Sequence, residues 1–210
     1  MLIIVLGGIK FDSSVSEWLS SLSTFATLMV AVYALFQWKE QKQYDVQVEA
    51  LSVLRVSADV VRNLRNPISS SGEINEKFFN AMNTELEQGK MSQNVIHEIY
   101  VFQSRMLRHE EDLKRVYQMK ERLWATFGDN HYLTNSFETI AKRIKDINNA
   151  YHKYAIANQM KDNLDKDMVR TELANARKIM YGMSGDEISK ELDDIISKAD
   201  SLKKRKPTLF

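Results

Sequence analysis

The sequence contains no cysteine among its 210 residues, and only 7 glycines and 2 prolines. Without cysteine there is no disulfide bond, no thiolate metal ligand and no cysteine nucleophile. Glycine and proline interrupt helices, so their scarcity favours long helices over many short strands. No segment shows a convincing strand pattern of alternating apolar and polar residues. We therefore expect an all-α protein.

The chain also lacks a large excess of charge of either sign. Its 29 lysines and arginines nearly balance 28 acidic residues, which leaves a net charge of +1. This balance disfavours nucleic acid as a partner, because nucleic-acid-binding domains are usually strongly basic. Charge is missing altogether from one stretch, the 21 residues from Trp18 to Trp38.

This uncharged stretch, 18–38, is predicted to be a transmembrane helix. At about 1.5 Å per residue it reaches roughly the 30 Å of a hydrocarbon core. Its second half reads FATLMVAVYALF, and the serines and threonines of its first half can bond to carbonyls of their own helix. Trp18, Trp38 and Lys39 are expected to anchor the two interfaces, where aromatic and cationic side chains are favoured.

The cations near the span indicate its orientation. Lys39 and Lys42 follow it closely, whereas Lys10 precedes it. This bias places the C-terminal side in the cytoplasm. The sequence thus divides into a short extracytoplasmic segment (1–17), the span (18–38), a cytoplasmic helical domain (39–202) and a basic tail (203–210).

The uncharged stretch has two other interpretations. A signal peptide could be cleaved after Ala34, but residues 1–17 are not basic as a signal peptide requires. A buried helix of a soluble protein is the other, because the stretch is rich in serine and barely long enough to cross a membrane. The membrane span is the favoured interpretation.

Small residues recur along the span at steps of four and three. Such a row lets membrane helices approach closely, so it predicts self-association of the span, although small residues are common in spans in general. The row consists of Ser20, Thr24, Thr27, Ala31 and Ala34.

Helical periodicity continues directly after the span, with an apolar row at Val48, Leu51, Leu54, Ala58 and Val61 that leads to Arg65. Apolar seams with alternating steps of four and three predict two long helices on either side of the break at Gly128, which should form an antiparallel hairpin. The sequence predicts helices over 39–66, 73–88, 92–127, 133–160, 164–182 and 187–202. The expected architecture is a transmembrane helix followed by an elongated bundle of about five helices.

The residues that carry chemistry form no recognised motif. His97 precedes Glu98, but position 101 is valine, so the zinc-protease helix pattern fails. Asp162, Asp165 and Asp167 lack the glycine and the final glutamate of a calcium loop. Phosphate-binding glycine motifs are missing too. We therefore predict no enzyme, no cofactor, no metal and no small-molecule substrate.

Two polar residues interrupt the apolar seam of 92–127, namely His109 and Lys120. Polar residues at seam positions commonly determine register or partner choice, so both are predicted to contribute to an interaction. The basic tail is predicted to contact anionic lipid, at about 1 kcal/mol per cation. A merely solvated tail and a nucleic-acid contact are the alternatives for these four residues, Lys203, Lys204, Arg205 and Lys206.

Three segments of the chain carry a resemblance to known proteins. They are STFATLMVAVYALFQWKEQK at 23–42, residues 51–55 and RNLRNP at 62–67. They resemble a loose group of uncharacterised bacterial proteins with one N-terminal span and a helical cytoplasmic region. The resemblance covers residues 20–75. It implies a location in the bacterial inner membrane and carries over no catalytic residues.

Together these features predict a membrane-anchored interaction or scaffold protein that binds membrane lipid and either a partner protein or a second copy. The alternative is a membrane-acting effector, for example in phage defence or exclusion, whose transmembrane helix oligomerises. Toxicity on overexpression that disappears when Thr27 and Ala31 become leucine would favour the effector.

Overall fold

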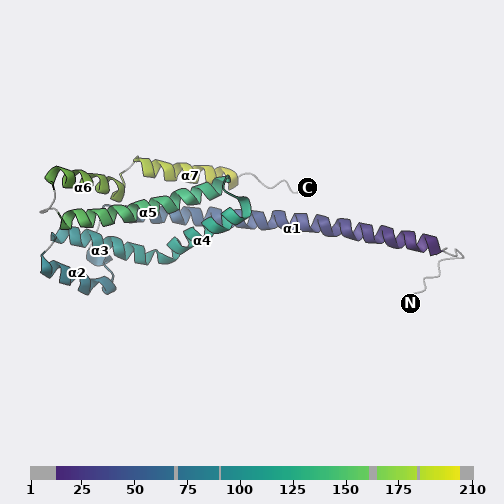
Figure 1. The fold of residues 1–210 in the computed structure, drawn as a ribbon, viewed down its shortest axis with the longest axis horizontal. Helices are drawn as coiled ribbons and strands as arrows, with labels where there is room; N and C mark the ends of the chain where they lie inside the picture. Colours follow the sequence, from purple (N-terminus) through teal and green to yellow (C-terminus); the bar gives the residue numbers. More distant parts are fainter. Residues whose placement is uncertain (1–12, 69–70, 90, 161–164, 184, 204–210) are drawn as a thin grey trace. The chain divides into compact units, whose positions relative to one another are not determined.

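The computed structural model describes residues 13–68, 71–89, 91–160, 165–183 and 185–203. Within these ranges the chain is entirely helical, which confirms the all-α prediction (Figure 1). The described residues hold seven α-helices and one 3₁₀ helix rather than the six predicted helices. They are α1 (Ser13–Leu64), η1 (Ser71–Glu73), α2 (Glu76–Gln88), α3 (Gln93–Arg108), α4 (Glu110–Phe127), α5 (Tyr132–Gln159), α6 (Lys166–Met180) and α7 (Glu187–Lys203).

The chain divides into two compact units, and the boundary falls inside α1. The N-terminal unit comprises residues 1–45, and the second unit, the helical domain, comprises residues 46–210. The N-terminal unit contributes the first part of α1, and the helical domain contains the rest of α1 and all the other helices.

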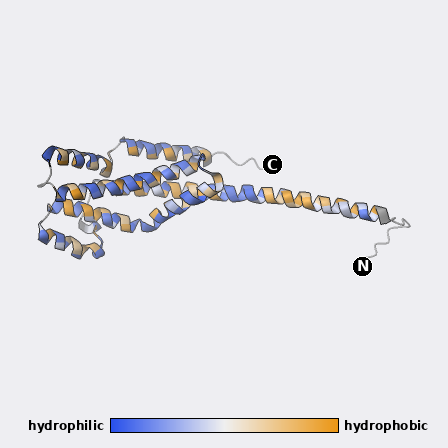
Figure 2. Cartoon of the chain, in the orientation of Figure 1, coloured by the Kyte–Doolittle hydropathy of each residue, from blue (hydrophilic) through white to orange (hydrophobic). Residues whose placement is uncertain are grey.

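In the N-terminal unit, α1 is apolar and uncovered. Every side chain from Val15 to Lys42 is exposed. In the view of Figure 2, hydrophobic residues predominate along the middle of this part of α1. A helix of this kind has no polar face to present to water, unlike the amphipathic helices of a soluble bundle.

The helical domain is built around α5, which packs against α3, α4, α6 and α7. The sequence makes α5 suitable for this central place because apolar residues recur at steps of three and four along it. Phe137, Ile140, Ile144, Ile147 and Tyr154 are all buried. At about 1.5–3 kcal/mol for each fully buried large side chain, this row is a main source of the domain's stability.

Helix ends follow local residue chemistry. The side chain of Asn75 accepts a hydrogen bond from the Lys77 amide and caps α2, which ends at Gly89 in a left-handed conformation with φ 62°. Gly128, with φ 78°, ends α4 and lets the chain turn into α5. The predicted stops at Gly89 and Gly128 are confirmed.

The prediction of one helix over 92–127 is also wrong, because the chain bends at His109 between α3 and α4. Helical hydrogen bonds continue through the bend, from the His109 amide to Arg105 O at 3.0 Å and from the Leu113 amide to His109 O at 2.8 Å. Two arginines occupy the last turn of α3 and three acidic residues the first turn of α4. Both groups favour helix termini at this point, since cations stabilise a helix C-terminus and anions an N-terminus.

Candidate functional site

The residues predicted to anchor and pair the span all lie in the uncovered part of α1. Trp18 and Trp38 are 69% and 61% exposed, and Lys42 Nζ lies 5.2 Å from the centre of the Trp38 ring. Lys39 is exposed as well. So are all five members of the small-residue row, Ser20, Thr24, Thr27, Ala31 and Ala34.

Two hydroxyl groups of this segment have partners within their own helix. Thr24 Oγ1 donates to Ser20 O at 2.9 Å, and Thr27 Oγ1 donates to Ser23 O at 2.8 Å. A hydroxyl bonded in this way can enter a hydrocarbon environment without losing its only hydrogen bond. Thr24 and Thr27 are therefore compatible with burial in lipid.

Among the described helices, α1 is the one long and apolar enough to cross a membrane. No residue of its most apolar window is buried within the chain. A core helix of a soluble protein would pass the same test of length and composition but would be covered by other elements. A signal sequence would pass it too.

In the helical domain, a buried arginine joins the end of α1 to the α6–α7 connection. Arg65 is only 2% exposed. It contacts the Asp186 carboxylate through Nη2 at 2.7 Å and Nη1 at 3.1 Å. Its Nε donates to Ile179 O at 2.8 Å and its Nη2 to Tyr181 O at 3.1 Å. We call this set of contacts the Arg65 clamp.

Asp186 is the acidic half of this clamp and also caps the start of α7. It accepts hydrogen bonds from the amides of Ser189 at 2.7 Å and Met183 at 3.0 Å. Burial by itself raises the pKa of Asp186, but the hydrogen bonds from Arg65 and from the two amides lower it by more. The net pKa lies well below the ordinary value of 3.8, so the carboxylate is ionised at neutral pH.

This depressed pKa makes the stability of the domain depend on pH. A lowered pKa adds stability that is fully present above the ordinary value of 3.8 and is lost as pH falls toward the folded-state pKa. The free energy of unfolding of the wild type exceeds that of Asp186→Asn at pH 5. We expect this difference to shrink by about 1 kcal/mol between pH 5 and pH 3. Denaturant unfolding of both proteins at the two pH values measures this. An unchanged difference would contradict the assignment.

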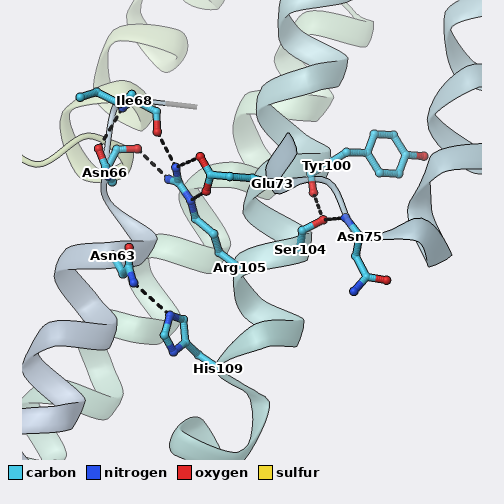
Figure 3. A network of polar contacts seen from close by, with 9 residues as sticks. All are labelled: Asn63, Asn66, Ile68, Glu73, Asn75, Tyr100, Ser104, Arg105 and His109. Atoms are coloured by element: carbon cyan, nitrogen blue, oxygen red, sulfur yellow. Dashed lines mark hydrogen bonds and ion pairs between the residues drawn. The ribbon is translucent and has the colours of Figure 1, made fainter. Parts of the chain in front are cut away.

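A second buried arginine, Arg105, holds the segment that follows α1 (Figure 3). It is also 2% exposed. Its Nε lies 2.8 Å from Glu73 Oε2. Its terminal nitrogens donate to the carbonyls of Asn66 at 2.7 Å and Ile68 at 2.5 Å. The guanidinium thus fixes η1 and the end of α1 against α3.

The structure assigns His109 a place different from the predicted one. It lies at the bend between α3 and α4 rather than on the seam of a continuous helix. Its Nε2 is 3.1 Å from Asn63 Nδ2 of α1, and its Nδ1 is 3.3 Å from Asp112 Oδ2. Lys120 is partly buried on α4. Both ring nitrogens of His109 thus contact groups of its own chain, and the role of His109 and Lys120 in an interaction stays a prediction.

The basic tail falls almost entirely outside the described residues. Lys203 ends α7, and Lys204, Arg205 and Lys206 follow the last described position. The expected contact of these four residues with anionic lipid therefore stays a prediction.

The interior of the domain also contains titratable side chains. The residues described hold no cluster of three or more potential metal ligands. Burial raises the pKa of Tyr154 and of Tyr181, and the nearby Glu98 carboxylate raises both further. Burial also raises the pKa of Tyr151 to about 12. These phenols therefore stay protonated near pH 7.

Sequence reasoning missed the two buried arginines. Arg65 had a visible signal, because it ends an apolar row of α1, and a cation in such a position is often buried with a partner. Arg105 had no such signal, since its partners are two backbone carbonyls and a carboxylate from a different segment.

Comparison of the chain with protein-family models, with curated proteins and with solved structures finds no match.

Proposed function

We propose that this chain is a single-pass protein of the bacterial inner membrane whose cytoplasmic helical domain is an interaction module for a protein partner or a second copy. Residues 18–38 would form the span, with residues 1–17 outside the cell membrane. The antiparallel pairing of α4 with α5 would form the rigid centre of the module. The observation that carries the proposal is the uncovered apolar part of α1.

The energetic cost of leaving that segment in water supports the proposal. Burying a large apolar side chain contributes about 1.5–3 kcal/mol. Leaving a dozen such side chains half exposed therefore costs on the order of 10 kcal/mol, which is comparable with the total stability of a typical domain. The side chains concerned are Trp18, Leu19, Leu22, Phe25, Leu28, Met29, Val30, Val32, Tyr33, Leu35, Phe36 and Trp38.

The polar interior of the helical domain supports an interaction module over an enzyme. The two buried arginines use their donors to hold helix ends and connections together. The buried tyrosines have raised pKa values. These groups serve the fold, so the exposed surface is the part left for function.

The mass of the full-length chain, gently extracted from membranes, tests the proposal. We expect the 24.4 kDa chain to migrate in a complex, either with a partner in fixed ratio or as an oligomer. Light scattering that accounts for bound detergent gives the protein mass directly. Arg65→Ala serves as a control, because unfolding of the domain should abolish the complex. A monodisperse monomer without any bound protein would contradict the proposal.

A further inference from the structure

A row of cations lies along α6, beside the face that packs against α5 (Figure 1). Lys166, Arg170 and Arg177 are separated by four and seven residues, which places them on one side of the helix. All three side chains are exposed. The buried residues of α6 are Val169, Ala176 and Met180.

A groove of about 380 Å³ opens along this row, and we call it the α6 groove. Its charged residues are one lysine and two arginines, which leave a net charge of +3. The acidic residues Asp167 and Glu172 of α6 do not line it. The described lining residues are Lys166, Val169, Arg170, Leu173, Ala174 and Arg177.

The cations of the α6 groove differ from most arginines of the helical domain, which have a carboxylate partner within the chain. Lys166 and Arg170 make no ion pair with any residue that the structure describes. Their positive charge is therefore available to a partner. The arginines that are paired within the chain are Arg55, Arg62, Arg65, Arg105, Arg122 and Arg143.

Arg177, the third cation, is held in position without being neutralised. Its Nη2 donates to the Tyr154 hydroxyl at 3.3 Å, and its guanidinium carbon lies 5.5 Å from the centre of the Tyr154 ring. The Tyr154 hydroxyl and, more weakly, the Glu98 carboxylate of α3 raise the pKa of Arg177, but Glu98 forms no ion pair with it. A guanidinium has five N–H donors, so most of those of Arg177 stay available to a ligand.

We propose that the α6 groove binds an acidic, amphipathic peptide segment of a protein partner. Carboxylates of the segment pair with the three cations, and an apolar side chain enters between them to contact Val169 and Leu173. The inference rests on the proposed function, because it names the site and the chemistry through which the interaction module recognises its partner.

The length of the cation row favours a peptide segment over a single small anion. At about 1.5 Å per residue, the row from Lys166 to Arg177 extends over about 16 Å. A phosphate ion between Lys166 and Arg170 would leave Arg177, two turns further on, unused. A peptide with acidic residues on successive turns reaches all three cations, and charge complementarity of this kind determines partner choice.

The apolar part of the α6 groove favours a peptide over a lipid surface. Val169 is only 7% exposed, and Leu173 is partly buried, so both lie below the cations. A helix that binds a bilayer presents large apolar side chains that insert into it. The exposed apolar residue that lines the α6 groove is Ala174, which is too small for that purpose.

Binding of a synthetic peptide to the full-length chain tests the inference directly. The chain is reconstituted in nanodiscs of phosphatidylcholine, so that no anionic lipid competes. The probe is a fluorescent helical peptide of about 15 residues with glutamate and leucine on one face. A peptide with lysine in place of glutamate is its matched control. We expect binding of the glutamate peptide alone, measured by fluorescence anisotropy and weakened by added salt.

A charge reversal places this binding in the α6 groove. The double variant Lys166→Glu, Arg170→Glu should raise the Kd of the glutamate peptide at least roughly tenfold, because two attractive charges become repulsive. Both side chains are exposed and unpaired, so the circular dichroism spectrum should stay that of the wild type. Lys142→Glu, Lys145→Glu makes the same change of charge at exposed positions of α5 and should leave the Kd unchanged.

Photo-cross-linking in native membranes tests the same site with the natural partner. A photo-reactive amino acid replaces Ala174 in the full-length chain, and the cross-linked peptide is identified by mass spectrometry. We expect a peptide with a net negative charge. Asn175 is exposed on a different side of α6 and does not line the α6 groove, so the same replacement there should not give this product.

The outcomes separate the inference from the proposed function. Selective binding of the glutamate peptide that is lost in Lys166→Glu, Arg170→Glu supports the inference. Equal binding of both peptides, or binding of phosphatidylglycerol vesicles in their place, would overturn it. A full-length complex of unchanged mass in the double variant would also overturn it and leave the interaction module intact. A wild-type monomer that binds neither a protein nor the peptide would overturn both.

Discussion

Replacing Arg65 with alanine is expected to lower the free energy of unfolding of the helical domain by about 3–5 kcal/mol. The guanidinium is almost fully buried, and its removal leaves the Asp186 carboxylate and several carbonyls of the α6–α7 connection without their main donor. Breaking a buried ion pair in this way strands a charge, which costs far more than the intact pair contributes. The backbone bond from the Gly182 amide to Arg65 O, at 2.8 Å, is kept in the variant, so the loss measures the guanidinium contacts.

Arg62→Ala is the matched control for this experiment. Arg62 lies on the same helix and pairs with Asp193 of the same partner helix, but its side chain is 41% exposed. An exposed pair contributes about 0–1 kcal/mol. Denaturant unfolding of the full chain in detergent, followed by circular dichroism, compares the two variants. Equal decreases in the free energy of unfolding for Arg62→Ala and Arg65→Ala would contradict the stabilising role of the Arg65 clamp.

The double variant Leu28→Arg, Val32→Arg is expected to abolish membrane insertion. Both positions lie near the middle of the predicted span, and each arginine there costs about 2.5–3.5 kcal/mol. The apolar residues of 25–36 contribute only about 0.3–0.6 kcal/mol each, so two arginines cancel most of the gain from insertion. Extraction of membranes with alkaline carbonate should move the variant into the soluble fraction.

The control for this variant carries the same added charge at the end of the span. Gln37→Arg, Gln41→Arg places both cations beside Trp38 and Lys39, where arginine side chains reach the polar interface. This protein should stay in the membrane fraction. If both double variants are extracted equally, or if neither is, residues 18–38 do not behave as a span.

Helix ends could be predicted from the sequence wherever a single residue determines the backbone conformation. Gly89 and Gly128 adopt positive φ, and Pro67 follows the end of α1 at Leu64, so local chemistry was sufficient. The bend at His109 was not predictable from spacing, because the apolar seam continues through it. There the charges at the two helix ends and the contact with Asn63 of α1 decide the backbone path.

The buried faces and polar clamps were harder to predict because they depend on contacts distant in sequence. Val48 was expected to face inward, yet Val46 and Ala50 are buried and Val48 is exposed. Apolar residues on both sides of α1 made the two orientations hard to distinguish by periodicity alone. The Arg65 clamp joins residues more than one hundred positions apart, so no local pattern describes it.

Protease treatment of spheroplasts from cells that express the full chain with a C-terminal tag tests the membrane anchoring most directly. We expect that the chain resists alkaline extraction and that the tag is protected until the cells are lysed. Extraction into the soluble fraction, or digestion of the tag in intact spheroplasts, would contradict a single span with a cytoplasmic helical domain.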